Sequence, residues 1–450
     1  MLNNYGFINK YSYLCNLLCK NMKVLKLIIA AFFFSLGMNA QTAKEEILKD
    51  IHNSASNYLA YPGPKQTKLT PAPDGKKPFY ISHYGRHGSR FLINKDDYDD
   101  PYKILAKADS LGKLTPLGQD VLRRVAMLRE EANLRLGELT QLGAEQHRQI
   151  AKRMFERFPE VFEGKANIDA KSTVVIRCIL SMENALFQLI TMNPDLRIRH
   201  DASQYDMWYM NFQDKKLKEE RKDSTLRNAY QTYTKDYECG YLLMPRLFND
   251  TAYVHKHVKV QHLGEDLFRL ASCIQNTEAR KKVTLYDIFS DEEIYNYWKI
   301  DNTWWYIYYG ACSLNGGKQP YNQRNLLRQI IQEADSCIAL PKPGATLRFG
   351  HETMVMPLTC LLGLNGFDLV TDNFDSLERK GWINYRVFPM GANIQFIFYR
   401  NNPEDKDVLV KVLLNENEAT LPIKNSMAPY YKWEEVRDYY LKKLDAYQGN

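Results

Sequence analysis

Short runs rich in β-branched and aromatic residues are spread over the whole chain, and longer segments with helical periodicity separate them. The runs cover residues 77–83, 171–176, 345–349, 394–399 and 408–414. Between them, apolar residues recur every three or four positions in 119–136 and 142–158, and an apolar helix over 354–362 is closed by Gly363. Short strands that alternate with helices predict an α/β core.

The N-terminal segment 22–40 has the pattern of a secretory signal peptide. Lys23 and Lys26 precede a short apolar run over 27–38, and Ala40 ends a small-residue cleavage site. The run is shorter than the roughly 20 apolar residues that a membrane-spanning helix needs, and no later run qualifies. We therefore expect an exported protein, periplasmic or secreted, without a stable membrane span. Translation from Met22 would make residues 1–21 a gene-model artefact; the alternative is a long charged region before the signal.

Composition narrows the classes of function. Hydrophobic residues make up 45% of the chain and charged residues 25%, as in soluble globular proteins, which excludes disorder over most of the chain. Without the first 40 residues, 56 basic and 53 acidic residues remain. This small excess excludes the strongly basic surface of a nucleic-acid-binding protein, so affinity for anions must come from a local pocket.

The cysteines indicate neither a zinc site nor a redox dithiol. Two of the eight, Cys15 and Cys19, belong to the presequence. The other six are widely spaced and include no Cys-x-x-Cys motif: Cys178, Cys239, Cys273, Cys312, Cys337 and Cys360. Their even number permits disulfide bonds in an oxidising compartment without indicating which pairs form.

The order of the segments predicts a discontinuous core. A presequence over 1–40 and a polar, Pro-rich arm over 41–75 precede it. We expect the α/β core to comprise 76–94, 165–200 and 336–450. Segments 95–164 and 201–335, with helical periodicity in patches, are predicted to form a helical cap or insertion.

Side chains suited to phosphate chemistry follow three of the predicted strands: Arg86, His87 and Arg90 after 77–83, Arg177 after 171–176, and His351 and Glu352 after 345–349. Ligands of open α/β sheets bind outside the carboxyl ends of the strands, so parallel neighbours would bring these groups together. Arginine offers a planar fork of donors that matches phosphate oxygens. The set therefore favours a phosphate monoester as ligand.

Each of these motifs alone has an ordinary structural interpretation. Arg177 could form a surface ion pair, and His351 with Glu352 could be a loop pair. A histidine held among arginines can instead attack phosphorus, and a neighbouring carboxylic acid can protonate the departing oxygen. The coincidence at three strand ends favours the functional interpretation.

The motifs resemble those of the histidine phosphatase superfamily, in its acid phosphatase and phytase branch. The core motif is Arg86-His87-Gly88-Ser89-Arg90, and the similar segments that follow in order are 137–143, 172–182 and 351–353. Among subfamilies the chain is most similar to the multiple inositol polyphosphate phosphatases, which are exported and act on phytate. The resemblance implies a three-layer α/β core with a mixed, mostly parallel sheet and a helical cap.

The resemblance also implies a role for each site residue. His87 would be the nucleophile and Glu352 the proton donor, while His351 and the three arginines Arg86, Arg90 and Arg177 would hold the phosphoryl oxygens. The substrate would be a small phosphomonoester, and no metal or other cofactor would be needed, because the arginines carry the positive charge.

Two positions depart from the family pattern. Phe91 and Leu92 stand where a proline often follows the core motif, which predicts a local change in the loop. The distal motif is His-Glu-Thr, whereas acid phosphatases have His-Asp and inositol polyphosphate phosphatases His-Ala-Glu. Glu352 thus stands where the aspartate would be, with one more methylene.

Other interpretations stay open at this point. A broad-specificity acid phosphatase or a phosphotransferase fits the same residues, and a catalytically silent phosphate-ester-binding protein is an alternative of another class. Outside the motifs, His255, His257 and His262 could form a metal site, although a solvated face is the simpler interpretation.

Overall fold

A computed structural model describes residues 42–447. The predicted presequence, including the signal segment 22–40, lies outside the described residues. The chain divides into two compact units, 1–46 and 47–450, and the second contains the whole sheet. No helix within 42–447 combines the length and the apolar character needed to cross a membrane.

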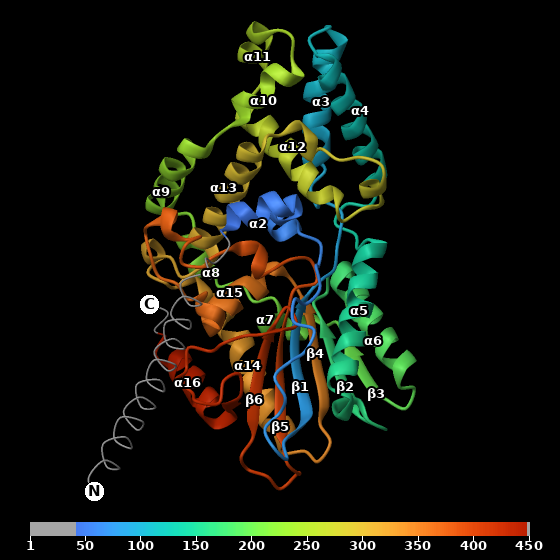
Figure 1. Ribbon diagram of the computed structural model, residues 1–450, viewed down its shortest axis with the longest axis vertical. Helices are drawn as coiled ribbons and strands as arrows, with labels where there is room; N and C mark the ends of the chain where they lie inside the picture. Colours follow the sequence, from blue (N-terminus) through green and yellow to red (C-terminus); the bar gives the residue numbers. More distant parts are fainter. Residues whose placement is uncertain (1–41, 448–450) are drawn as a thin grey trace, which may run out of the picture. The chain divides into compact units, whose positions relative to one another are not determined.

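One mixed sheet forms the centre of this unit (Figure 1). Its strands are β1 Lys77–Arg86, β2 Asn167–Ser172, β3 Arg197–Asp201, β4 Gly344–Gly350, β5 Asn393–Arg400, β6 Leu409–Leu414, β7 Asn417–Glu418 and β8 Tyr431–Lys432. They lie in the order β3-β2-β4-β1-β5-β6-β7, and β8 pairs with β6. β3, β2, β4 and β1 are parallel, whereas β5 to β8 pair antiparallel.

The register of β1 and β4 positions the two sequence motifs. Arg86 at the end of β1 pairs with Gly350 at the end of β4. His87 and His351 are the next residues of these two parallel strands, and the amide of His87 donates to the carbonyl of Gly350 over 2.9 Å. The distal and core motifs therefore meet at one edge of the sheet, although 264 positions separate them in the chain.

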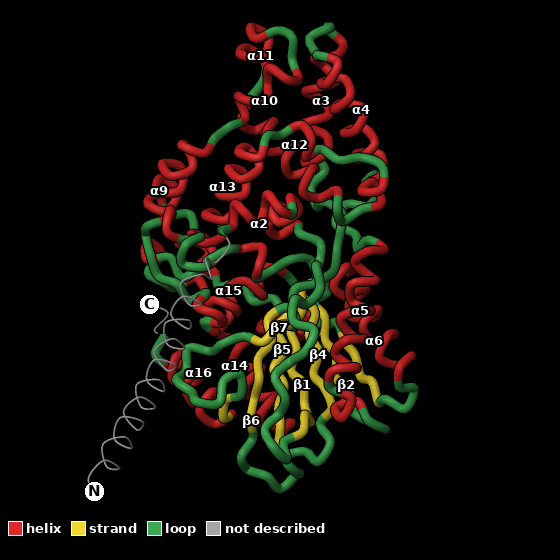
Figure 2. Tube along the Cα trace, in the orientation of Figure 1, coloured by secondary structure: helices red, strands yellow, loops and turns green. Residues whose placement is uncertain are grey.

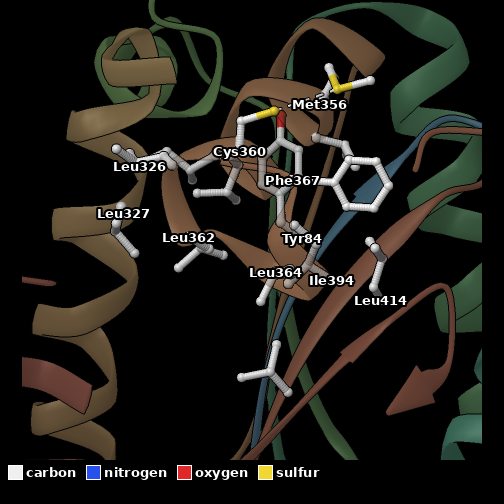
Figure 3. Packing of buried hydrophobic residues seen from close by; sticks show 14 of the residues in the cluster. Tyr84, Leu326, Leu327, Met356, Cys360, Leu362, Leu364, Phe367, Ile394 and Leu414 are labelled. Atoms are coloured by element: carbon white, nitrogen blue, oxygen red, sulfur yellow. Dashed lines mark hydrogen bonds between the residues drawn. The ribbon is translucent and has the colours of Figure 1, made fainter. Parts of the chain in front are cut away.

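Helices cover both faces of the sheet. α5 Gln141–Arg157 and α6 Ile176–Met192 share an apolar cluster with Ile81 of β1 and Leu347 of β4. On the other face, α14 Arg324–Ile338, α15 Glu352–Leu362 and α16 Trp433–Asp445 pack against β1, β5 and β6. Figure 3 shows side chains from α14, α15, β1 and β5 meeting in this second cluster. The three-layer α/β prediction is confirmed.

The remaining long segments are helical and lie beyond the carboxyl ends of β1 and β4 (Figure 2). They comprise α3 Asp96–Ser110, α4 Pro116–Glu131, α7 Met207–Met210, α8 Lys215–Glu220, α9 Ser224–Thr234, α10 Gly240–Leu247, α11 Thr251–His257, α12 Val260–Ile274 and α13 Asp291–Tyr309. α2 Ala43–Lys49 crosses the boundary between the two units. A short 3-10 helix, η1 Ile51–Tyr58, packs against α12 and α13.

The strand predicted over 171–176 is wrong in its extent. β2 ends at Ser172, and Arg177 lies in the first turn of α6. Ser181 lies inside α6 and donates to the carbonyl of Arg177 over 2.8 Å. The β-branched run 173–176 resembles a strand, but it joins an amphipathic segment whose apolar face packs on the sheet.

Two helices assigned to the cap from sequence pack on the sheet instead. α5 contributes Ala151 and Met154 to the cluster around Ile81, and α14 contributes Ile330 to the cluster on the opposite face. The six cysteines of the described chain are all free thiols, so the permitted disulfide bonds are not formed. His255, His257 and His262 are exposed and do not converge on a shared site.

Truncating a central strand residue is expected to destabilise the fold strongly. Leu347 of β4 is 1% exposed within the cluster beneath α5 and α6. Leu347→Ala should lower the free energy of unfolding by about 2–5 kcal/mol, because it removes buried methyl groups and leaves a cavity. Urea unfolding measures the change. Leu111→Ala, at a half-exposed position, is the matched control and should cost less than about 0.5 kcal/mol; equal losses would contradict the packing described.

Candidate active site

His87 lies at the floor of the site, directly after β1. Its side chain is fully buried. Nδ1 lies 2.9 Å from the carbonyl oxygen of Gly88, a contact that selects the tautomer with hydrogen on Nδ1 and a lone pair on Nε2. Burial lowers the pKa of His87 well below its usual value, and the neighbouring Arg86 and Arg177 add to this effect. The imidazole therefore favours its neutral form, and its Nε2 faces Glu352 at 3.5 Å.

Three guanidinium groups converge on this imidazole. Arg86 is fully buried: Nη1 donates to the carbonyls of Asn57 and Phe388, which leaves Nε to face the site. Arg90 is 2% exposed, and Arg177 reaches in from α6. Burial and the other arginines lower the pKa of both Arg86, to about 10, and Arg177. A cluster of buried guanidinium groups of this kind is suited to an anion.

His351 forms the opposite wall. Its ring centroid lies 5.8 Å from that of His87, and its Nε2 lies 3.2 Å from the hydroxyl of Thr173. The thiol of Cys178 packs against the same ring at 3.8 Å. Burial lowers the pKa of His351 to about 4. This neutral ring is fixed in place where it can donate to a bound phosphoryl oxygen.

Glu352, the first residue of α15, places its carboxylate among the three arginines and the two histidines. We call the hollow that these six side chains form the cup. Oε2 lies 3.1 Å from Nε of Arg86 and 3.5 Å from Nε2 of His87, and Oε1 lies 4.0 Å from Nη2 of Arg90. Burial alone would raise the pKa of this carboxyl, but Arg86 and the other cations hold it well below the ordinary value. The carboxylate thus favours its ionised form and balances the arginines.

All six residues predicted from sequence meet in this cup: Arg86, His87, Arg90, Arg177, His351 and Glu352. One ligand atom each of His87, His351 and Glu352 lies within 4.8 Å of the others, a spacing that could also hold a metal ion. The guanidinium groups of Arg86 and Arg90 would repel a cation there. The arrangement suits a phosphoryl group better.

The loop that carries the nucleophile is held by groups that the sequence analysis did not identify. The amide of Ser89 donates to Oε1 of Gln146 over 2.9 Å, and the Ser89 hydroxyl donates to Oδ1 of Asn276 over 2.6 Å. The amide of Gly88 donates to the Ser181 hydroxyl over 3.1 Å. A Cβ atom at Gly88 would lie 2.3 Å from the carbonyl oxygen of Gly143, so only glycine permits this approach.

Tyr58 is a further residue of the site that sequence patterns missed. The Arg90 guanidinium lies 5.5 Å from its ring centroid, and Tyr58 helps to raise the pKa of Arg90 although burial opposes this. Tyr58 ends η1, in the segment predicted to be a surface arm. No local pattern marks the residue, because its contact with Arg90 arises only when the arm folds across the strand ends.

A model of the histidine phosphatase superfamily, branch 2, matches residues 85–415. Among curated proteins, multiple inositol polyphosphate phosphatase 1 of Drosophila melanogaster is 29% identical over 142 residues. That match covers 31% of this chain and 29% of the relative's length.

Two solved structures share the fold. A multiple inositol polyphosphate phosphatase of Bifidobacterium longum, in complex with inositol hexasulfate, has a TM-score of 0.71 at 18% identity, over 86% of this chain and 97% of that chain. The phytase from D. castellii has a TM-score of 0.60 at 14% identity, over 88% and 85%. The α/β core with its helical domain is thus an architecture shared with these enzymes.

Buried neutral histidines should make the fold sensitive to acid. Burial lowers the pKa of His83 to about 3 and of His147 and His351 to about 4, against about 6.5 in an unfolded chain. Below pH ~6.5 the unfolded chain binds protons that the folded chain does not, so the free energy of unfolding falls as the pH falls. Each histidine contributes up to ~1.4 kcal/mol per pH unit.

The contribution of one histidine can be measured by difference. His147→Gln should reduce the slope of unfolding free energy against pH by about one proton between pH 6.5 and 4.5, whatever its effect on absolute stability. Urea unfolding across this range gives the slope. His257→Gln, at an exposed position, is the control. An unchanged slope in His147→Gln would show that His147 is protonated in the folded protein.

Proposed function

Because the chain belongs to the histidine phosphatase superfamily, branch 2, and is by that membership a histidine acid phosphatase, we propose that it hydrolyses inositol polyphosphates through a phosphohistidine on His87. The observation that carries the proposal is the neutral His87 ring, whose Nδ1 is bonded to Gly88 while Nε2 faces the arginine cup. Few other reactions need a buried neutral imidazole surrounded by guanidinium groups.

The first step forms the covalent intermediate. The ester phosphoryl group binds to Arg86, Arg90 and Arg177 and displaces the Glu352 carboxylate from Arg86. Nε2 of His87 then forms a bond to phosphorus as the bond to the ester oxygen breaks. With the guanidinium charges engaged by phosphate, the force that lowers the pKa of Glu352 is removed, so this group can carry a proton and give it to the leaving oxygen.

The second step releases phosphate. Glu352, now a carboxylate, accepts a proton from a water molecule, whose oxygen attacks phosphorus. The phosphorus–nitrogen bond breaks, the electron pair returns to Nε2, and inorganic phosphate leaves the cup. His87 is again neutral, and Glu352 loses its proton to solvent. The three arginines hold the charge that spreads over the phosphoryl oxygens in both steps.

Two observations support the proposed substrate class: the names of the similar proteins, and one arginine near the cup, Arg221. The names of the similar proteins, multiple inositol polyphosphate phosphatase and phytase, support an inositol polyphosphate. Arg221 lies 4.0 Å from the ring centroid of Tyr309. Tyr309 is near Glu352, whose negative charge adds to burial in raising the pKa of the Tyr309 phenol. Arg221 bonds to Gln319 and has no acidic partner among the described residues, so it is suited to a second phosphate.

We further propose that the protein is exported. The support is the signal-like segment 22–40, with Lys23 and Lys26 before its apolar run. N-terminal sequencing of the protein from culture medium or periplasm tests cleavage of this segment, and a chain that begins at Met1 or Met22 would contradict its assignment as a cleaved signal peptide.

Replacing the nucleophile should abolish turnover. His87→Ala removes the atom that bonds to phosphorus, so phosphate release from phytate should fall by at least about 10³-fold. Wild-type enzyme quenched with alkali during turnover should retain radioactive phosphate on His87, and the variant should retain none. His257→Ala, which alters an exposed histidine, should keep full activity. Wild-type rates in His87→Ala would refute the assignment.

Replacing the proton donor should affect substrates according to their leaving groups. Glu352→Gln cannot give a proton, so the rate of phosphoenzyme formation from glycerol 2-phosphate, whose alkoxide leaves poorly, should fall about 10²-fold or more. For p-nitrophenyl phosphate the loss should be under tenfold, because its phenolate leaves without help. Single-turnover assays on both esters measure the two losses. Equal losses would assign the proton donor to another residue.

A further inference from the structure

A second cavity, of about 390 Å³, adjoins the cup from the side of η1. We call it the η1 cavity. Its walls come from η1, α12 and α13, together with Tyr230 of α9. The aromatic residues among its lining are Tyr58, Tyr230, Phe268, Tyr297, Trp304 and Trp305. Its volume lies in the range of small-molecule sites, which run from roughly 300 to 1,000 Å³.

The η1 cavity shares a wall with the catalytic cup. Tyr58, which contacts Arg90, and Asn57, whose carbonyl accepts from Arg86, both line it. Trp305 also lines it and packs against Phe388, with ring centroids 4.6 Å apart. Two residues of the cavity lining therefore contact arginines of the cup.

The charged residues that line the η1 cavity disfavour both anionic and cationic ligands. Asp301 and Glu265 present carboxylates to the cavity, and the one basic residue of the lining, Arg269, is already paired with Asp97 and Asp266 at 3.0 Å each. A further phosphate would meet these carboxylates without a free cation. A cationic ligand would instead approach Arg269 and the arginines of the adjoining cup.

A strained residue holds one of these carboxylates in place. Ser56 has φ of 56° and ψ of −121°, a conformation that costs a non-glycine residue of order 1–3 kcal/mol. Its hydroxyl donates to Oδ2 of Asp301, and Nδ2 of Asn384 donates to the same oxygen over 3.1 Å. This leaves Oδ1 of Asp301 available, and the fold maintains the arrangement despite the strain.

We propose that the η1 cavity binds the uncharged, hydroxyl-bearing part of the leaving group, such as the free-hydroxyl side of a partly dephosphorylated inositol ring. Hydroxyl groups donate to carboxylates without adding charge, and the carbon–hydrogen faces of the ring pack on aromatic side chains. The proposal rests on the proposed function and narrows it: inositol phosphates with free neighbouring hydroxyls would be preferred over the fully phosphorylated ring.

The test separates the cavity from the cup by kinetics. Trp304→Leu and Asp301→Asn should each raise KM for myo-inositol 1-phosphate about tenfold, the loss expected for one stacking or charged hydrogen-bond contact. The inhibition constant of inorganic phosphate, which fills only the cup, should stay within twofold of the wild-type value. Trp208→Leu, at a half-exposed tryptophan outside the cavity, is the matched control and should change neither constant. Parallel changes in both constants, or none, would overturn the proposal.

Binding of the neutral ring alone distinguishes failure of this proposal from failure of the proposed function. Calorimetric titration of the wild-type protein, saturated with phosphate, should detect myo-inositol, and Trp304→Leu should weaken that binding about tenfold. Absence of binding to a wild-type enzyme that hydrolyses phytate would refute the cavity proposal and leave the enzymatic assignment intact. A wild-type protein that binds myo-inositol but releases no phosphate would refute the proposed function instead.

Discussion

The site depends on the attraction between one carboxylate and a set of buried guanidinium groups. Burying Arg86 and Arg90 beside Arg177 is costly unless an anion accompanies them, and the Glu352 carboxylate lies where it can be that anion. The same contact keeps Glu352 ionised, so it cannot serve as an acid before substrate arrives. In the proposed mechanism, exchange of the carboxylate for a phosphoryl group would both fill the cup and allow Glu352 to take up the proton that it donates.

The topology of the sheet brings the carboxylate, the histidines and the arginines together at one edge. Because β1 and β4 are parallel neighbours in register, the nucleophile loop and the first turn of α15 start side by side. α15 begins at Glu352, so the positive end of the helix dipole further favours the ionised carboxylate. Arg177 then enters from α6, across β4 from β1. No element supplies the whole site, which explains why the chemistry is distributed over such distant segments.

The sequence predicted the residues of the cup better than it predicted their surroundings. Strands 77–83 and 345–349 were correctly located because a short apolar run that ends in a charged motif is typical of a buried strand, and their parallel pairing placed His87 beside His351. The run 173–176 was misassigned, since β-branched residues in a helix entry and in a strand look alike locally. Tyr58 and Asn276 could not be foreseen, because only tertiary packing brings them to the loop.

The two hollows on either side of Tyr58 select for different chemistry. The cup attracts a dianion through charge, which works for every phosphomonoester alike and therefore discriminates poorly among them. The η1 cavity contains paired charge, carboxylate acceptors and aromatic faces, so as a site for the leaving group it would disfavour a phosphate and favour a hydroxyl. Substrate preference would then be set by the fit of the ring's hydroxyl pattern to Asp301 and Trp304 rather than by the number of phosphates it carries.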